Sequence, residues 1–173
     1  MTVRRSIGIV LAVSSTILVV NGIRLGIPAV QTMNDDPRNA PVTFVSYYAW
    51  GVHPNIIVFD LWDVDGSASK LDVMRVLLQF SDKLQERSFD EVRLSWRGDA
   101  RFVIPGNYFQ QIGSEYSWQN PVYTIRTFPE NIMKLDGRPA FSTWTGGMLG
   151  VLGQQMDDVS EFHDRWYGSA ASF

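Results

Sequence analysis

The chain has 173 residues, of which 45% are hydrophobic, and this is enough for one globular domain with a buried core. It has no cysteine, which excludes disulfides, thiolate catalysis and thiolate metal sites, and its two histidines leave carboxylates as the main candidate metal ligands. Only three of the 15 basic side chains, Arg4, Arg5 and Arg24, and no acidic one fall in residues 1–30, so the remainder is clearly acidic. An acidic domain without a basic cluster is not expected to bind nucleic acid.

Residues 1–30 are predicted to be a membrane anchor or a signal segment. Arg4 and Arg5 precede the uncharged stretch Ile7–Ile23, which is slightly shorter than the ~20 residues of a typical membrane-spanning helix. The positive-inside rule then places the amino terminus in the cytoplasm and the folded domain outside. We therefore expect a single-pass membrane protein. A cleaved signal, leaving a secreted or periplasmic domain, is the alternative, since "VNG" and "IPA" are imperfect cleavage sites.

Residues 31–41 are polar and interrupted by proline, which predicts a linker between the apolar segment and a single domain over residues 42–173. The domain begins with residues 42–50, which are rich in β-branched and aromatic side chains. Residues 56–62 have the same character and are more apolar. Both segments are predicted to be β-strands.

A helix and a hairpin are predicted next. Residues 69–87 repeat leucine and methionine at three- and four-residue steps, and Ser69 with Asp72 resembles a capping box at the start of a helix. Residues 90–106 alternate apolar and polar side chains on both sides of Gly98-Asp99. This pattern predicts a β-hairpin.

The rest of the chain is expected to alternate helices with one strand. Asn107 can begin a short helix, residues 120–128 are a strand candidate, and residues 145–167 carry an apolar stripe at helical spacing. Glycines at three- and four-residue steps, among them Gly150 and Gly153, predict close packing of this last helix. The sequence thus predicts an α+β fold: a small mixed or antiparallel sheet covered by helices at about 69–87 and 145–167, preceded by an amino-terminal apolar helix.

The segment "DVDGS", Asp63 to Ser67, follows an apolar strand and resembles the first motif of haloacid-dehalogenase-type phosphatases. The resemblance implies that Asp63 attacks phosphorus, that Asp65 protonates the leaving group and that magnesium screens the charge. It covers five residues, and the only later acidic pair, Asp157-Asp158, falls inside a predicted helix instead of at a strand end. A small metal-dependent hydrolase or phosphatase using Asp63 and Asp65 is therefore the alternative function.

Two further interpretations of the same segment need no phosphate. A calcium loop would use Asp63, Asp65 and Asp72, but Leu61 stands where its first ligand is required. A strand-to-helix turn needs only turn-forming residues and acids ahead of a helix, which are electrostatically favourable there. We adopt the turn and expect no catalytic residue, no metal ligand and no cofactor.

Two other segments, residues 115–123 and residues 141–147, combine aromatic side chains with amides and hydroxyls. Such mixtures suit a recognition surface because aromatic rings provide large contact areas at low entropic cost, although such loops can also be anchored to the core by their own rings. The expected binding residues, which should lie together at one rim of the sheet, are Tyr116, Trp118, Gln119, Asn120 and Trp144. The predicted function is a membrane-tethered, extracytoplasmic domain of the cell envelope that binds or assembles with a protein partner.

Overall fold

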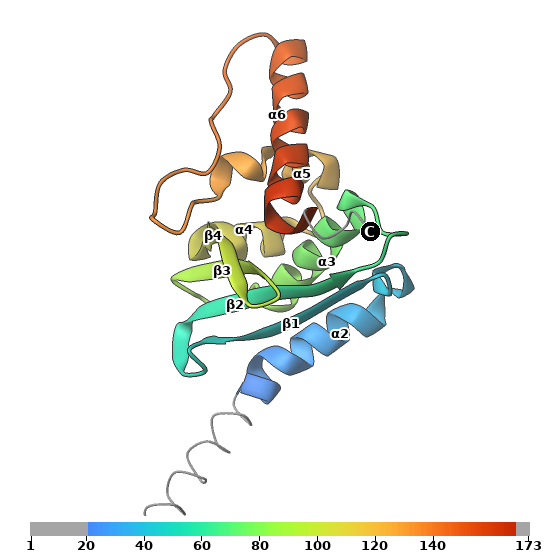
Figure 1. Ribbon diagram of the computed structural model, residues 1–173, viewed down its shortest axis with the longest axis vertical. Helices are drawn as coiled ribbons and strands as arrows, with labels where there is room; N and C mark the ends of the chain where they lie inside the picture. Colours follow the sequence, from blue (N-terminus) through green and yellow to red (C-terminus); the bar gives the residue numbers. More distant parts are fainter. Residues whose placement is uncertain (1–20, 169–173) are drawn as a thin grey trace, which may run out of the picture.

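The computed structural model describes residues 21–168, apart from the side chains of residues 148 and 149 (Figure 1). Residues 1–20, which make up most of the predicted anchor and of the expected amino-terminal apolar helix, lie outside the described residues, whereas residues 22–30 are described and helical. Within residues 21–168, no helix is both long enough and apolar enough to cross a bilayer.

The described part of the chain contains four strands and five α-helices. The strands are β1 (Val42–Ala49), β2 (His53–Val64), β3 (Glu91–Trp96) and β4 (Asp99–Pro105). The α-helices are α2 (Ile27–Asp35), α3 (Lys70–Lys83), α4 (Gly106–Glu115), α5 (Pro121–Thr127) and α6 (Met148–His163). Shorter π- and 3₁₀-helical segments are η1 (Gly22–Gly26), η2 (Pro37–Asn39), η3 (Pro129–Asn131) and η4 (Asp164–Gly168).

The strands form one mixed sheet in the order β1-β2-β3-β4. β1 pairs antiparallel with β2, and β3 pairs antiparallel with β4, whereas β2 and β3 run parallel and are connected through α3. The predicted hairpin is confirmed: Trp96 pairs with Asp99 across Arg97-Gly98, whose φ angles of 49° and 85° are those of a tight primed turn. The predicted α+β class with a mixed sheet is confirmed as well.

The core lies between one face of the sheet and a layer of helices. Phe44 of β1 and Phe59 of β2 stack with ring centroids 4.3 Å apart, and both rings contact Phe80 of α3. Trp166 of η4 contacts Phe59, and its indole N–H donates to the backbone oxygen of Ser95 at 3.0 Å. The helix α3 and the end of α6 therefore cover the same face of the sheet.

The residues expected to form a polar linker are folded against the domain. The helix α2 contacts α3 and β1, and Leu25 and Ala29 are buried there. Asn39 is fully buried and donates to the backbone oxygen of Thr32 at 2.7 Å. The Asn39 side chain thus has a partner within the protein, and α2 and η2 both contact α3.

The strand predicted over residues 120–128 is instead the helix α5. Pro121 occupies its first turn, and the side chain of Asn120 accepts a hydrogen bond from the Val122 N–H at 3.0 Å. A proline at the first helical position and an asparagine N-cap are strong helix-start signals. They outweigh the β-branched and aromatic residues that suggested a strand.

The helix α6 is buried only in its second half and projects from the rest of the molecule with its first half (Figure 1). Phe162 is buried, whereas Leu152 and Met156 of the predicted apolar stripe are exposed. A Cβ atom added at Gly150 or Gly153 would meet nothing within 4 Å. The expectation that these glycines pack closely is therefore wrong.

Candidate functional site

The outer side of α3 carries a long groove. It consists of two cavities of about 400 and 480 Å³ that share Arg38 and Tyr116 as lining residues. We call them the polar half and the apolar half of the α3 groove. Charged and amide side chains line the polar half, among them Asp35, Asp36, Gln79, Asp82 and Lys83. Mainly apolar side chains line the other half, among them Leu71, Leu78, Pro121, Val122 and Ile125.

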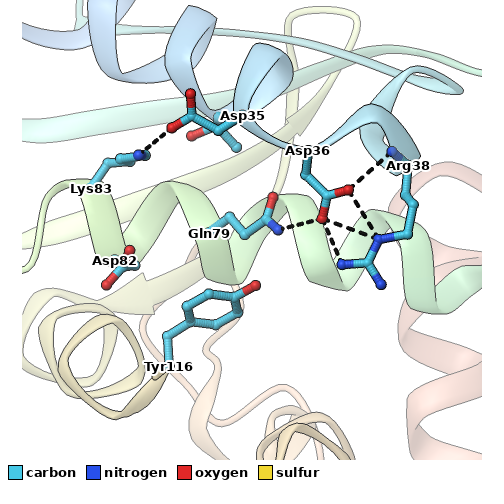
Figure 2. Close-up of a pocket in the computed structure, with 8 residues that line it drawn as sticks. Asp35, Asp36, Arg38, Gln79, Asp82, Lys83 and Tyr116 are labelled. Atoms are coloured by element: carbon cyan, nitrogen blue, oxygen red, sulfur yellow. Dashed lines mark hydrogen bonds and ion pairs between the residues drawn. The ribbon is translucent and has the colours of Figure 1, made fainter. Parts of the chain in front are cut away.

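A carboxylate held by several donors marks the polar half (Figure 2). Asp36 accepts hydrogen bonds from the Arg38 backbone N–H at 3.0 Å, from Arg38 Nη2 at 2.7 Å and from Gln79 Nε2 at 2.9 Å. The Arg38 and Gln79 side chains hold the pKa of Asp36 far below its usual value. Asp36 is therefore ionised at every physiological pH.

Arg75 of α3 extends this network to the neighbouring turn. Its Nη1 lies 2.7 Å from Asp72 Oδ1, its Nε donates to Asn39 Oδ1 at 3.0 Å, and its Nη2 donates to the Arg38 backbone oxygen at 2.6 Å. The charges of this wall thus have partners of the opposite sign or polar partners. Such a network holds the side chains of this wall in place.

The apolar half is a cleft between α3 and the start of α5. Leu78 is buried at the α3 side, while Leu71 and Val122 are exposed large apolar side chains. Tyr116 lies at the junction of the two halves, and Figure 2 shows its ring across Gln79 from Asp36. An apolar cleft with a polar wall at one end is suited to a segment that presents both kinds of side chain.

The predicted binding residues of the α4–α5 connection have different environments. Tyr116 lines the groove, whereas Trp118 is exposed and its indole N–H donates to the Ser114 backbone oxygen at 3.0 Å. Gln119 accepts a hydrogen bond from the Asn120 backbone N–H at 2.9 Å, and the Asn120 side chain caps α5. The last two residues therefore shape the connection.

Trp144 is fixed to a different element. Its indole N–H donates to Asp158 Oδ2 of α6 at 2.6 Å. Among the described hydrogen bonds and ring contacts, none joins Trp144 to Tyr116 or Trp118. A single cluster of all five predicted binding residues stays a prediction, and Tyr116 is the member that lines a groove.

The two aspartates of the alternative function lie at the end of β2. Asp63 is exposed, with its Oδ1 3.7 Å from Arg97 Nη2. Asp65 Oδ1 accepts hydrogen bonds from the Ser67 N–H at 2.8 Å and from Ser67 Oγ at 2.6 Å, and these bonds lower the pKa of Asp65. Between residues 21 and 168, no group of three or more histidine, aspartate or glutamate side chains could hold a metal ion. The geometry is that of a turn leading into α3.

A third cavity, of about 300 Å³, lies beside this turn and is lined by Lys70, His163 and Tyr167. His163 is buried, and neither of its ring nitrogens has a hydrogen-bond partner among residues 21–168. Burial, and to a lesser extent the Lys70 ammonium, lowers the pKa of His163 to about 3. The Lys70 ammonium itself is bound by Asp164 Oδ1 at 2.9 Å. His163 is therefore a neutral imidazole at physiological pH.

A buried carboxylate on the sheet escaped the sequence analysis. Asp60 of β2 accepts hydrogen bonds from the Tyr47 hydroxyl at 3.2 Å, from Trp62 Nε1 at 3.1 Å and from the Gly98 N–H at 2.9 Å. Burial, together with this carboxylate, raises the pKa of Tyr47. The signal for Asp60 was present in the sequence, since it is the one acid inside the apolar run "IIVFDLW".

The chain was compared with protein-family profiles, with curated protein sequences and with solved structures. None of the three comparisons finds a match.

Most lining residues of the α3 groove were missed by sequence reasoning. Arg38 was assigned to a linker, and Val122 and Ile125 were assigned to a strand. The sequence carries no signal for Leu71 or Val122, because Leu71 continues the predicted apolar stripe of its helix and Val122 fell in a predicted strand, yet both side chains are exposed. Only the packing of α5 beside α3 brings them together.

Proposed function

We propose that this chain is a membrane-tethered domain, located outside the cytoplasm, that binds a segment of a protein partner in the α3 groove. The observation that carries the binding role is the apolar half of the groove, a cavity of about 480 Å³ lined mainly by α3, α5 and the connection that precedes α5. Exposed apolar clefts of this kind mark interaction sites.

The shape and charges of the groove favour an amphipathic segment as the occupant. Leu71, Leu78 and Ile125 can contact apolar side chains, while Asp82 at the polar end favours a basic or amide side chain. Lys83 binds Asp35, so Asp82 is the acid of this wall without an ion-pair partner among the described side chains. This arrangement supports a partner helix or strand with one cationic end.

The tethering role rests on the sequence. Arg4 and Arg5 precede the uncharged stretch Ile7–Ile23, and the remainder of the chain is acidic. The positive-inside rule favours a cytoplasmic amino terminus for such a chain. A reporter active only outside the cytoplasm, fused after Phe173, is expected to be active; activity only of a cytoplasmic reporter would contradict this orientation.

Site-specific photo-crosslinking in membranes tests the binding role. A photoreactive residue at Val122, inside the groove, is expected to yield one discrete protein adduct. The matched control is Leu135, which is 57% exposed and does not line the groove. Adding Tyr116→Ala should weaken the Val122 adduct, because the ring at the junction of the two halves is lost. Equal adducts at Val122 and Leu135, or no effect of Tyr116→Ala, would argue against the groove.

A further inference from the structure

The helical segment that leads into the domain is apolar on two opposite sides. Leu25 and Ala29 are buried on the side that faces the domain. Ile23, Ile27 and Val30 follow one another at four- and three-residue steps and are 59%, 49% and 59% exposed. A surface helix normally carries polar side chains on the side away from its core. The outer apolar stripe therefore indicates a second apolar partner.

The turn between β1 and β2 places two more apolar side chains beside this segment. Trp50 is 71% exposed and Val52 is 59% exposed. The Asn21 side chain donates to the Gly51 backbone oxygen at 2.8 Å and accepts from the Tyr48 N–H at 2.8 Å. These bonds tie the turn to the start of η1, and Figure 1 shows both at the end of the molecule away from the projecting part of α6.

Trp50 occupies the first central position of the tight turn between β1 and β2, which the Val52 N–H closes by donating to the Ala49 backbone oxygen at 3.2 Å. Its φ angle is 52°, in the left-handed region that bulky residues rarely adopt. The Arg93 guanidinium lies 5.0 Å from the centre of its ring. Gly51 follows with a φ angle of 77°, so Trp50-Gly51 forms a tight primed turn like that at Arg97-Gly98. A large indole is thus held outward at the tip of the turn.

The sequence places the uncharged stretch Ile7–Ile23 directly before this end of the domain. From Ile23 to Val30 an α-helix rises about 10 Å, which is enough to cross the interfacial layer of roughly 5–8 Å on one side of a bilayer. Tryptophan is enriched in that layer, and arginines such as Arg24 and Arg93 suit its phosphate groups. Arg93 Nη2 also pairs with Glu91 Oε1 at 2.7 Å.

We propose that Ile23, Ile27, Val30, Trp50 and Val52 form a membrane-contact surface that inserts into the interfacial layer of a lipid bilayer. The proposal rests on the proposed tethering and adds an orientation to it. The domain lies with this end on the lipid, and the first half of α6 projects away from the bilayer.

Fluorescence quenching by lipid tests the surface in the full chain. The protein is reconstituted into vesicles of phosphatidylcholine and phosphatidylglycerol, with and without brominated acyl chains. The emission of Trp50 is obtained as the difference between the wild type and Trp50→Phe. Trp118, which is 68% exposed and lies on the α4–α5 connection, is treated in the same way through Trp118→Phe and serves as the matched control.

Brominated lipid is expected to remove most of the Trp50 emission and little of the Trp118 emission. Equal quenching of the two, in protein that floats with the vesicles, would overturn the membrane-contact surface and leave the tethering intact. Protein that does not float with the vesicles would overturn both. Trp50 that is shielded from a water-soluble quencher but not quenched by lipid would indicate a protein contact at this surface, and so would also overturn the proposal.

A second measurement does not depend on tryptophan substitution. Since the chain has no cysteine, Val52→Cys carries a polarity-sensitive label at one position only. Its emission is expected to shift to the blue on reconstitution, whereas the same label on Leu135→Cys should not shift, although Leu135 is 57% exposed. Identical spectra at the two positions would contradict insertion.

Discussion

At the residue scale, the described part of the molecule separates acids and histidines that are bound within the fold from those at its surface. Asp60 is buried with three donors around it, whereas Asp63, three residues later, is exposed beside Arg97. His163 is buried without a hydrogen-bond partner in the described part of the chain. Substitutions at Asp60 and Asp63 are therefore expected to change the free energy of unfolding by different amounts, although both residues are aspartates of β2.

Asp60→Ala is expected to lower the free energy of unfolding by roughly 1–3 kcal/mol, because it leaves the Tyr47 hydroxyl, the Trp62 indole N–H and the Gly98 N–H without their acceptor. Asp63→Ala, the matched control, should change it by less than about 0.5 kcal/mol, since exposed ion pairs contribute little. Urea unfolding of both variants at pH 7 measures the difference. Equal effects would mean that the Asp60 hydrogen bonds contribute nothing.

His163 should make the stability depend on pH. Its pKa is about 3 in the folded protein and near 6.5 in an unfolded chain, so the folded state favours the neutral ring. The neutral His163 ring therefore contributes to the free energy of unfolding. This contribution is complete above pH 6.5 and is lost as the pH falls toward 3, by about 1.4 kcal/mol per pH unit. His163→Phe should therefore lose roughly 2 kcal/mol less than the wild type between pH 7 and pH 5.

Urea unfolding of the wild type and of His163→Phe at both pH values is the measurement. At pH 7 the variant should be about as stable as the wild type, because no hydrogen bond is removed. If the variant had the same pH dependence as the wild type, the pKa of His163 would be the same in the folded and the unfolded protein.

At the scale of elements, α3 and α4 approach each other closely at Gly113. A Cβ atom added at Gly113 of α4 would lie 2.4 Å from the backbone oxygen of Ser81 in α3. The Ser81 hydroxyl is also buried and donates to the Leu78 backbone oxygen at 2.8 Å. Backbone therefore meets backbone at this point, and neither helix can move aside without losing core contacts.

Gly113→Ala is expected to destabilise the protein by roughly 1–3 kcal/mol through overpacking. Gly150→Ala, the matched change in α6, should stabilise it by up to about 1 kcal/mol, because alanine favours a helix and the space is open. Thermal unfolding should then shift in opposite directions for the two variants. A lower melting temperature for Gly150→Ala would indicate a contact for α6 that lies outside the described residues.

At the scale of the whole molecule, the described domain begins before the predicted boundary. Leu25 and Ala29 belong to the hydrophobic core, and Asp36, Asn39 and Arg75 form a hydrogen-bonded network that holds η2 against α3. The same region forms the polar wall of the α3 groove. Folding of α2 onto the sheet and formation of the groove are therefore linked.

A fragment of residues 42–173 should be less stable than a fragment of residues 21–173 by at least about 2 kcal/mol, because it loses the burial of Leu25 and of the side chains that α2 covers. Urea unfolding of the two fragments checks this. The shorter fragment should also lose the polar half of the groove. Equal stability would support the domain boundary at residue 42 that the sequence predicts.

The elements that the sequence predicts correctly are those whose stabilising contacts join residues close together in the chain. Ser69 and Asp72 form the predicted capping box of α3, with the Ser69 N–H donating to Asp72 Oδ2 at 2.7 Å. Gly98 has the positive φ angle that the β3–β4 turn needs. In both cases the stabilising contacts lie within four residues of each other, so the pattern and the structure carry the same information.

Tertiary contacts decided the rest. The parallel pairing of β2 with β3, the packing of α2 on α3 and the α3 groove join residues far apart in the chain, such as Arg38, Leu78 and Val122. The sequence by itself determined the α+β class, the acidic domain after an apolar start, the helix α3 and the hairpin. Which polar residues are buried, and which apolar ones stay exposed, was decided only in three dimensions, because burial depends on the neighbours that the fold brings to each side chain.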